Sequence, residues 1–346
     1  MPDFPRVSVV ICNHNYGHFI DEAIRSALEQ TLPAAEVVLV DDGSTDNSVE
    51  VARRHGDRIR IIQQPNGGQM AAYNTGFDHV TGDVVLFLDS DDKLLPGALS
   101  EVAKAMVDPE VARVHFKLEL IDVGGQALGG VIPTQLAEGD LSALVRQGVL
   151  FLAAPGSGNA YRVEALRRVM PLPVSEQERH GADFFAGYAS AFVGKVRALN
   201  QVLGQYRIHQ TNDTQSLRFG NARLGLRGSQ MIQARYRHLK QWLDRRLPNE
   251  QLADVAVVDF SIRKQEYAAA VFCDQGYLAG VKAGLAGLPA LNRSIWGREC
   301  GWPMKLGLTS WALFVLFAPR GIGLPIARYV CNPSSRRQLL GTRGMF

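Results

Sequence analysis

Short apolar runs rich in valine and isoleucine alternate with amphipathic segments over the first third of the chain. The runs predict strands at residues 7–12, 36–41, 58–63 and 83–89. The segments between them predict helices at residues 19–30, 44–54 and 68–80. This alternation predicts an α/β fold, in which helices flank a mostly parallel central sheet.

Each predicted strand ends in a polar or glycine-rich cluster. The four clusters are CNHNYG, DDGSTDNS, QPNGGQ and DSDD. Ligands of open parallel sheets bind at the carboxyl ends of the strands, so a single ligand site explains all four clusters. No GxGxxG follows the first strand and no GxxxxGK[ST] is present, which excludes the dinucleotide fingerprint and the P-loop.

The fourth cluster places Asp89, Asp91 and Asp92 directly after an apolar strand. A divalent cation would relieve the repulsion among these carboxylates, and hard oxygen ligands suit Mg²⁺ or Mn²⁺. The alternative is a plain turn and helix start, in which Asp92 caps the helix and Pro96 lies in its first turn.

Four segments, in this order and spacing, resemble the nucleotide-binding half of family 2 glycosyltransferases with the GT-A fold. They are VSVVICNHNYGHFIDEAIRSALEQT, VVLVDDGSTDNS, NGGQMAAYNTG and VVLFLDSDDKLLPG, and together they span about residues 6–106. The resemblance implies a nucleotide-diphosphate sugar donor, a divalent metal (Mg²⁺ or Mn²⁺) and inversion at the anomeric carbon.

The resemblance also implies the donor-binding residues. They are Cys12, His14, Asn15, Asp41, Asp42, Gln69 and Asp89. Asp41 is expected to accept a hydrogen bond from the base, and Asp42 to support that loop. His14 is expected to stack on the base, where the family often has proline or threonine followed by tyrosine. Gln69 is expected near the donor.

Asp89 and Asp91 form the D-x-D pair of the family. Asp91 is the expected direct metal ligand, and Asp89 is expected to reach the sugar or ribose. His209, in the segment YRIH, is either a further metal ligand or a structural residue.

The implied catalytic base is Asp183, which is followed by a helix and then by the family-like segments GKV and YRIH. A carboxylate at this point would remove the proton of the acceptor hydroxyl. Ala182 replaces the acidic residue that often precedes the base. The alternative role for Asp183 is a helix cap.

Three parts of the chain are expected. Residues 1–215 form the catalytic domain, with the donor half at 1–106 and the acceptor-side half, which includes a hairpin, at 107–215. Residues 216–346 form an α-helical extension. Its segment 306–319 has 14 residues, fewer than the roughly 20 that span a bilayer, so it is a buried helix or an interfacial anchor. The basic sequence that follows is compatible with peripheral contact with an anionic membrane surface, although short apolar helices usually pack inside a core.

Composition restricts the remaining function classes. The net charge of +3 gives no reason to expect a nucleic-acid partner, and four scattered cysteines predict neither a disulfide framework nor a zinc site. The N-terminal sequence does not have the pattern of a signal peptide, so we expect a cytoplasmic protein, peripheral at the inner face of the membrane if the tail binds lipid.

We therefore predict an inverting glycosyltransferase that acts on a glycan or lipid-linked acceptor, in surface polysaccharide or glycoconjugate biosynthesis. A sugar nucleotidyltransferase is one alternative, but it needs a glycine- and Lys/Arg-rich loop after the first strand, and CNHNYGHF has none. A non-catalytic nucleotide-sugar binding protein is the other alternative, which Ala182 suggests and which measured turnover would exclude.

Overall fold

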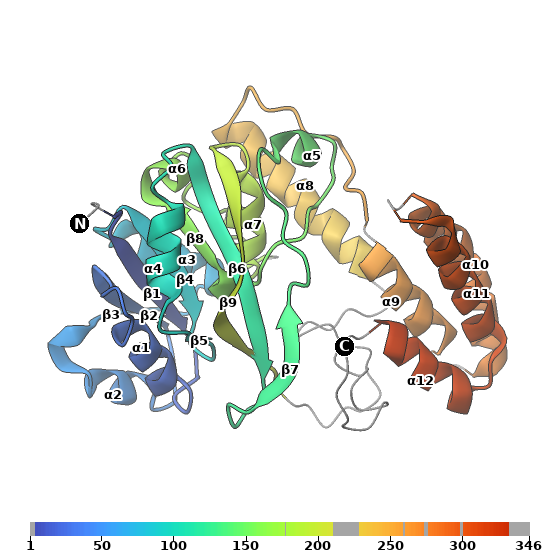
Figure 1. The fold of residues 1–346 in the computed structure, drawn as a ribbon, viewed down its shortest axis with the longest axis horizontal. Coiled ribbons are helices and arrows are strands. Elements are labelled where there is room, and N and C mark those ends of the chain that lie inside the picture. Colours follow the sequence, from blue (N-terminus) through green and yellow to red (C-terminus); the bar gives the residue numbers. More distant parts are fainter. Residues whose placement is uncertain are drawn as a thin grey trace. The chain divides into compact units, whose positions relative to one another are not determined.

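The computed structural model describes residues 4–176, 178–209, 228–258, 260–272, 276–297 and 300–331. The chain divides into two compact units. The first comprises Met1–Arg207 and His238–Asp254, and the second comprises Ile208–Arg237 and Val255–Phe346 (Figure 1). The expected boundary between residues 215 and 216 falls outside the described residues and stays a prediction.

The first unit is an α/β structure. Its strands are β1 (Val7–Asn13), β2 (Glu36–Asp42), β3 (Arg60–Gln64), β4 (Val84–Asp89), β5 (Lys93–Leu94), β6 (Val111–Ile121), β7 (Ala127–Ile132), β8 (Asn159–Arg162) and β9 (Lys195–Arg207). Its helices are α1 (Ile20–Leu28), α2 (Ser48–Arg53), α3 (Gln69–Asp78), α4 (Ala98–Ala105), α5 (Ser142–Arg146), α6 (Val163–Arg167) and α7 (Ala182–Ser190), with short 3₁₀ turns η1 (Gly56–Arg58) and η2 (Gly156–Gly158).

One sheet runs through this unit in the order β3-β2-β1-β4-β8-β6-β9-β5, and β7 pairs with β6. Strands β1 to β4 are parallel to one another, and β9 is parallel to β6. Strand β8 runs antiparallel to β4 and β6 and joins the two parallel parts. The predicted α/β fold with a mostly parallel sheet is confirmed, and β6 and β7 form the expected hairpin.

Helices cover both faces of the parallel part because side chains alternate along each strand. Val9 and Ile11 of β1 belong to the cluster that buries Ile20 and Ile24 of α1. On the opposite face, Gly76 lets α3 approach, since a Cβ there would lie 2.3 Å from Val10 Cγ1. The sheet is thus fixed between helices, and its strand ends are held in place.

The second unit is helical in its described part, which confirms the predicted C-terminal extension. Its elements are the first part of α8 (Gly228–Arg246), α9 (Phe260–Val271), α10 (Tyr277–Trp296), α11 (Trp302–Phe317) and α12 (Arg320–Cys331). Helices α9 to α12 enclose a separate apolar cluster that includes Tyr267, Leu291, Trp311 and Val315. No helix among the described residues is both long and apolar enough to cross a membrane.

Candidate active site

The ends of β1, β2 and β4 bring the predicted polar clusters together. In the sheet register, Cys12 of β1 pairs with Asp89 of β4, and Asn13 pairs with Asp41 of β2. Asp41 and Asp89 therefore flank the end of β1. Cys12 itself is buried, and burial, followed by the charges of Asp89 and Asp42, raises the pKa of its thiol well above the usual value.

Asp41 is buried and held on both oxygens. Asn13 Nδ2 donates to Asp41 Oδ1 at 2.8 Å, and the backbone N–H of Ser44 donates to Asp41 Oδ2 at 3.1 Å. A carboxylate oxygen accepts more than one hydrogen bond, so this arrangement fixes the group and leaves it acceptor capacity.

Asp42 points to a different loop from Asp41. Its carboxylate accepts hydrogen bonds from the backbone N–H groups of Gly67 (2.8 Å) and Gly68 (2.6 Å) and from Gln64 Nε2 (2.7 Å). Gly68 has a φ of 86°, a conformation that favours glycine. Asp42 thus holds the glycine-rich loop that leads into α3.

His14 and Asn15 form the outer edge of the site. His14 is exposed, and its Nδ1 donates to the carbonyl oxygen of Asp42 at 2.9 Å. Asn15 adopts a φ of 60°, and its Oδ1 accepts the backbone N–H of Thr45 at 2.7 Å. His14 thus lies at the exposed edge of the site, whereas Asn15 braces the two loops.

Asp89 has a pKa well above that of an ordinary aspartate. Its burial, together with the negative charges of Asp91 and Asp183, raises the pKa to about 7. Gln69 Nε2 donates to Asp89 Oδ1 at 3.2 Å, which partly opposes this shift. Such a concentration of negative charge favours a bound cation.

Asp92 has a structural role, but it does not cap a helix as the plain-turn alternative requires. It is buried, and its two oxygens accept Ser157 Oγ at 2.6 Å and the backbone N–H of Arg207 at 2.9 Å. Helix α4 begins only at Ala98. The plain-turn alternative is therefore wrong in its role for Asp92, because this carboxylate ties the turn to η2 and β9.

Arg207, at the end of β9, fixes the same turn from behind. Its guanidinium is fully buried, with Nε donating to the carbonyl of Asp91 at 2.8 Å and Nη2 lying 3.1 Å from Glu22 Oε2. It also lies over the ring of Phe19, 4.4 Å from the centroid. The backbone of the D-x-D turn is thus held by a buried cation.

Asp183 lies in the first turn of α7, and Gln69 connects the start of this helix to the strand ends. Gln69 Oε1 accepts the backbone N–H groups of Gly181 (3.0 Å) and Ala182 (3.2 Å), while its Nε2 binds Asp89. One amide side chain therefore bridges the D-x-D segment and the helix that carries the predicted base. Asp183 is half-buried, and Ala182 is completely buried.

Arg113, which the sequence analysis did not single out, supports the loop before η2. Arg113 of β6 is fully buried and donates to Asn159 Oδ1 through Nε (3.0 Å) and Nη2 (2.7 Å). Asn159 Nδ2 in turn donates to the carbonyls of Ala154 (3.1 Å) and Pro155 (2.7 Å), which shapes the loop before η2. The available signal was Arg113 and His115, two polar residues two apart in an apolar strand.

Gly156 on this loop lies against Asp89. A Cβ at Gly156 would lie 2.9 Å from Asp89 Oδ2 and 3.0 Å from Tyr73 Oη. Tyr73 stacks on Phe87 at 3.9 Å, and its buried hydroxyl has no hydrogen-bond partner within the described part of the chain. Only glycine fits this position without displacing a polar group of the site.

Asp89 and Asp91 are the residues expected to hold the metal, and their carboxylates are hard oxygen ligands. No group of three or more His, Cys, Asp or Glu side chains within the described ranges is arranged to hold a metal ion. Mg²⁺ in nucleotide sites is usually held by one or two carboxylates together with phosphates, so a carboxylate pair fits this role. His209 is half-buried in the second unit, and its role as a ligand stays a prediction.

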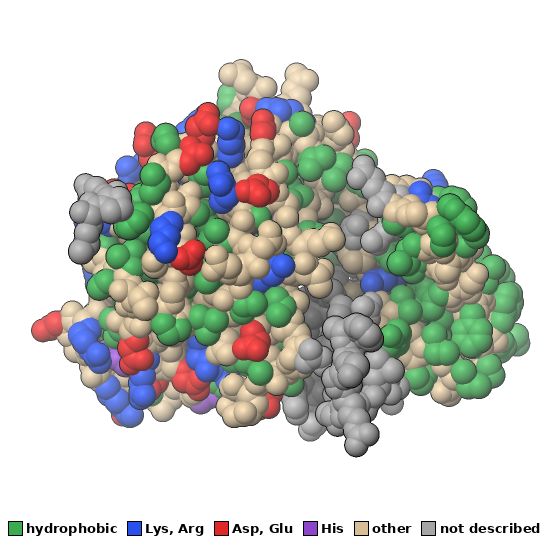
Figure 2. Space-filling model, viewed as in Figure 1, with side chains coloured by type: hydrophobic (Ala, Val, Ile, Leu, Met, Phe, Trp, Pro, Cys, Tyr) green, Lys and Arg blue, Asp and Glu red, His purple; other side chains and the backbone are tan. Residues whose placement is uncertain are grey.

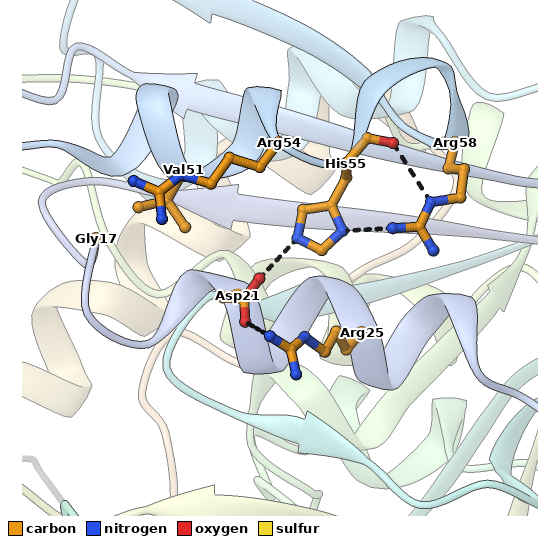
Figure 3. Close-up of a pocket in the computed structure, with 7 residues that line it drawn as sticks. All are labelled: Gly17, Asp21, Arg25, Val51, Arg54, His55 and Arg58. Atoms are coloured by element: carbon orange, nitrogen blue, oxygen red, sulfur yellow. Dashed lines mark hydrogen bonds and ion pairs between the residues drawn. The ribbon is translucent and has the colours of Figure 1, made fainter.

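A cavity of about 470 Å³ lies away from this cluster, between α1, α2 and η1 (Figure 3). Its buried His55 lies 2.9 Å from Asp21 Oδ1 through Nε2, and 3.2 Å from Arg58 Nη2 through Nδ1. Arg25 binds the other oxygen of Asp21. These groups satisfy one another, so the network holds α1 against α2.

Comparison with known proteins identifies the family. The family model described as glycosyl transferase family 2 matches residues 8–168, which contain nearly all of β1 and the whole of β2 to β8. An uncharacterized glycosyltransferase of Nostoc sp. (strain PCC 7120), alr2836, is 38% identical over 218 residues, which are 61% of this chain and 67% of that protein. The chain belongs to glycosyl transferase family 2.

The other similarities agree with this family. EpsJ of Bacillus subtilis, named an uncharacterized glycosyltransferase, is 43% identical over 91 residues, which are 25% of this chain and 26% of EpsJ. The chain therefore matches about a quarter of that relative. The crystal structure of S. aureus TarS 1–349 in complex with UDP-GlcNAc aligns with a TM-score of 0.51 at 15% identity, over 96% of this chain and 92% of that chain. This likeness shows the fold, and the predicted GT-A glycosyltransferase is confirmed.

Proposed function

We propose that this glycosyltransferase transfers a sugar from a nucleotide-diphosphate donor to an acceptor hydroxyl with inversion, using Mg²⁺ or Mn²⁺ and Asp183 as general base. The observation that carries the proposal is the connection of Asp89, through Gln69, to the start of α7. It joins the metal motif to the helix of the base within one unit.

The donor would bind along the ends of β1, β2 and β4. Asp41 would accept a hydrogen bond from the base, and His14 would stack on it, because one is a fixed acceptor and the other an exposed ring. Asp91 would be the direct metal ligand, with Asp89 toward the sugar or ribose. A bound divalent cation would neutralise the diphosphate leaving group.

The reaction needs one base that removes the proton of the attacking sugar-acceptor hydroxyl. The acceptor oxygen forms a bond to the anomeric carbon as the bond from this carbon to the diphosphate oxygen breaks. The hydroxyl proton passes to the carboxylate of Asp183, and the nucleoside diphosphate leaves. A single displacement of this kind inverts the configuration.

The proposed acceptor is a glycan or lipid-linked saccharide of a surface polysaccharide or glycoconjugate pathway. Peripheral contact with a membrane belongs to this proposal, since a lipid-linked acceptor is presented at a bilayer surface. A non-catalytic nucleotide-sugar binding protein is the competing function, because Ala182 stands where an acidic residue is common in the family.

A thermal-shift panel of UDP, GDP, dTDP, ADP and CDP, with and without Mn²⁺, tests donor binding. A ligand that binds only the folded state raises the apparent stability. We expect a shift that requires Mn²⁺ and one base. If no nucleotide shifts the folded protein, the donor site is wrong.

Two variants separate binding from chemistry. We expect Asp91→Asn to abolish the metal-dependent shift. Asp183→Asn should keep that shift and lower transfer by about 10²-fold or more, as general-base loss usually does. Asp57→Asn, an exposed carboxylate of η1, is the matched control. Full transfer activity of Asp183→Asn would refute the assignment of the base. If the wild-type protein binds a nucleotide but shows no turnover, the protein is a nucleotide-sugar binding protein.

A further inference from the structure

The outward face of α11 is apolar although its inward face already packs in a core. Trp311, Ala312, Val315 and Leu316 are buried in the cluster formed with α9, α10 and α12. The outward side chains of the same helix are 45–70% exposed: Trp302, Met304, Leu306, Leu313, Phe314 and Phe317. A helix that is apolar on all sides is normally buried or in contact with lipid.

The neighbouring helices extend this surface. Leu278, Leu285 and Trp296 of α10 are exposed, and so are Ile322 and Tyr329 of α12. Figure 2 shows hydrophobic side chains covering the side of the second unit where these helices lie. Soluble proteins rarely expose apolar surface of this extent unless it binds something. We call the outward side of α10, α11 and α12 the apolar face.

The charges of the apolar face are all of one sign. Its described helices carry Lys282, Arg293, Lys305, Arg320 and Arg328, and the described residues from 276 to 331 include no Asp or Glu. Lys305 lies beside Trp296, with Nζ donating to the Trp296 carbonyl at 2.9 Å. Aromatic and basic side chains side by side are typical of surfaces that lie in a lipid interface.

The length of α11 determines how it would meet a bilayer. Its 16 residues extend about 24 Å, which is shorter than the roughly 30 Å of the hydrocarbon core. It would therefore lie in the interface, with the buried side still packed on the second unit. The buried-helix alternative for residues 306–319 describes the inward side of α11. The interfacial-anchor alternative would describe its outward side.

We propose that the apolar face binds an anionic phospholipid surface, with Phe314 and Phe317 inserted among the acyl chains and the basic residues at the phosphates. A second copy of the chain is the competing occupant. Two such faces would bring five cationic side chains of each copy together, whereas lipid phosphates complement them. The proposal assigns a surface to the peripheral membrane contact of the proposed function and rests on that part of it, but not on the donor site or on the reaction.

Vesicle flotation with the full chain tests this proposal. We expect flotation with phosphatidylcholine vesicles that contain phosphatidylglycerol, and much weaker flotation with phosphatidylcholine alone. The double variant Phe314→Ser and Phe317→Ser should lower the partition coefficient about tenfold or more, because each phenylalanine loses its apolar transfer energy. Lys282→Gln with Arg293→Gln should remove most of the preference for anionic lipid.

A matched control changes exposed apolar residues of the first unit. Val107→Ser with Leu128→Ser should leave flotation unchanged. Circular dichroism and the thermal midpoint of each variant show that it is folded, which is expected because all the replaced side chains are exposed. Equal loss of flotation in this control would refute the assignment to α11.

Tryptophan emission gives an independent signal. Trp296 and Trp302 are exposed, whereas Trp242 and Trp311 are buried. Anionic vesicles should shift the emission to the blue, and brominated lipid should quench it, both by less in Trp302→Phe. Absence of flotation and of this shift would overturn the proposal. So would a dimer in analytical ultracentrifugation that the double phenylalanine variant converts to a monomer, since the face would then join two copies.

Discussion

Gln69 shows how much a single side chain contributes to the site. Replacement by glutamate keeps an acceptor for Gly181 and Ala182 but removes the donor to Asp89. Two half-buried carboxylate groups would then face each other at 3.2 Å. We expect Gln69→Glu to lower the free energy of unfolding by about 1–3 kcal/mol, measured by urea titration.

The matched control for Gln69 is on the surface. Gln201 Nε2 donates to Glu101 Oε2 at 3.3 Å, and Gln201 is exposed. Gln201→Glu brings two carboxylates together in water, where the cost should stay below about 0.5 kcal/mol. Equal effects of the two variants would show that burial of the Gln69 contact contributes little.

His115 predicts a specific loss of stability in acid. Burial, followed by the charge of Arg113, lowers its pKa from 6.5 to about 3. The unfolded chain therefore binds a proton that the folded chain does not, so His115 stabilises the fold above pH 6.5 and this contribution is lost as the pH falls toward 3. The loss is about 1.4 kcal/mol per pH unit at most.

Urea unfolding from pH 7 to pH 4 tests this dependence. His115→Gln keeps a polar side chain that does not titrate, so its unfolding free energy should fall less steeply below pH 6.5 than that of the wild type. Parallel curves for the two proteins would place the acid sensitivity elsewhere.

The sequence predicted which residues lie at the same edge of the sheet. It did not predict which of their carboxylates are occupied by structural hydrogen bonds. Asp41, Asp89 and Asp91 were predictable because each follows a strand, and strand ends share one edge of the sheet. The burial of Asp92 against Ser157 and Arg207 was not, since these partners are 65 and 115 residues away. No local pattern specifies contacts of that separation.

At the level of elements, the end of β9 connects parts that are distant in sequence. Arg207 reaches α1 through Glu22, the D-x-D turn through Asp91, and the β6–β7 hairpin through the carbonyls of Asp122 and Val123. We expect Arg207→Met to lower the unfolding free energy by about 3 kcal/mol or more, because these part-buried acceptors lose a fully buried cationic donor. Urea titration measures the change.

Glu22→Gln is the control for this variant. The Glu22 side chain is 46% exposed and leaves the backbone contacts of Arg207 in place, so its cost should be below about 1 kcal/mol. If Glu22→Gln cost as much as Arg207→Met, the ion pair and not the backbone anchoring would stabilise the turn.

Element prediction succeeded where the pattern is local. The first four strands and the helices between them were found within a few residues of their observed bounds, because alternation and helical spacing are properties of short segments. The antiparallel insertion of β8 between β4 and β6 was not predicted, since strand order depends on long-range pairing. For the segment 306–319, sequence could not distinguish a buried from an exposed side, because both sides of α11 are apolar.

For the whole molecule, we expect the proposed membrane binding to depend only partly on salt. Raising the ionic strength from about 0.05 to 0.5 M shortens the screening length severalfold, so flotation with anionic vesicles should weaken. It should not vanish, because the insertion of apolar side chains does not depend on charge. Complete loss of flotation in high salt would mean that the basic residues act without insertion of the phenylalanines.

The contacts of Arg207 also set an order in which the site is completed during synthesis. The parallel pairing of β1 to β4 needs only the first 89 residues. The D-x-D turn, however, takes two of its anchors from β9: Arg207 holds Asp92, and β5 pairs with Gly204 and Gln205. A ribosome-bound chain that ends before this strand would therefore carry a folded β1 to β4 sheet without a finished D-x-D turn. The nascent enzyme would acquire its chemistry late, at the moment the last strand of the sheet leaves the exit tunnel.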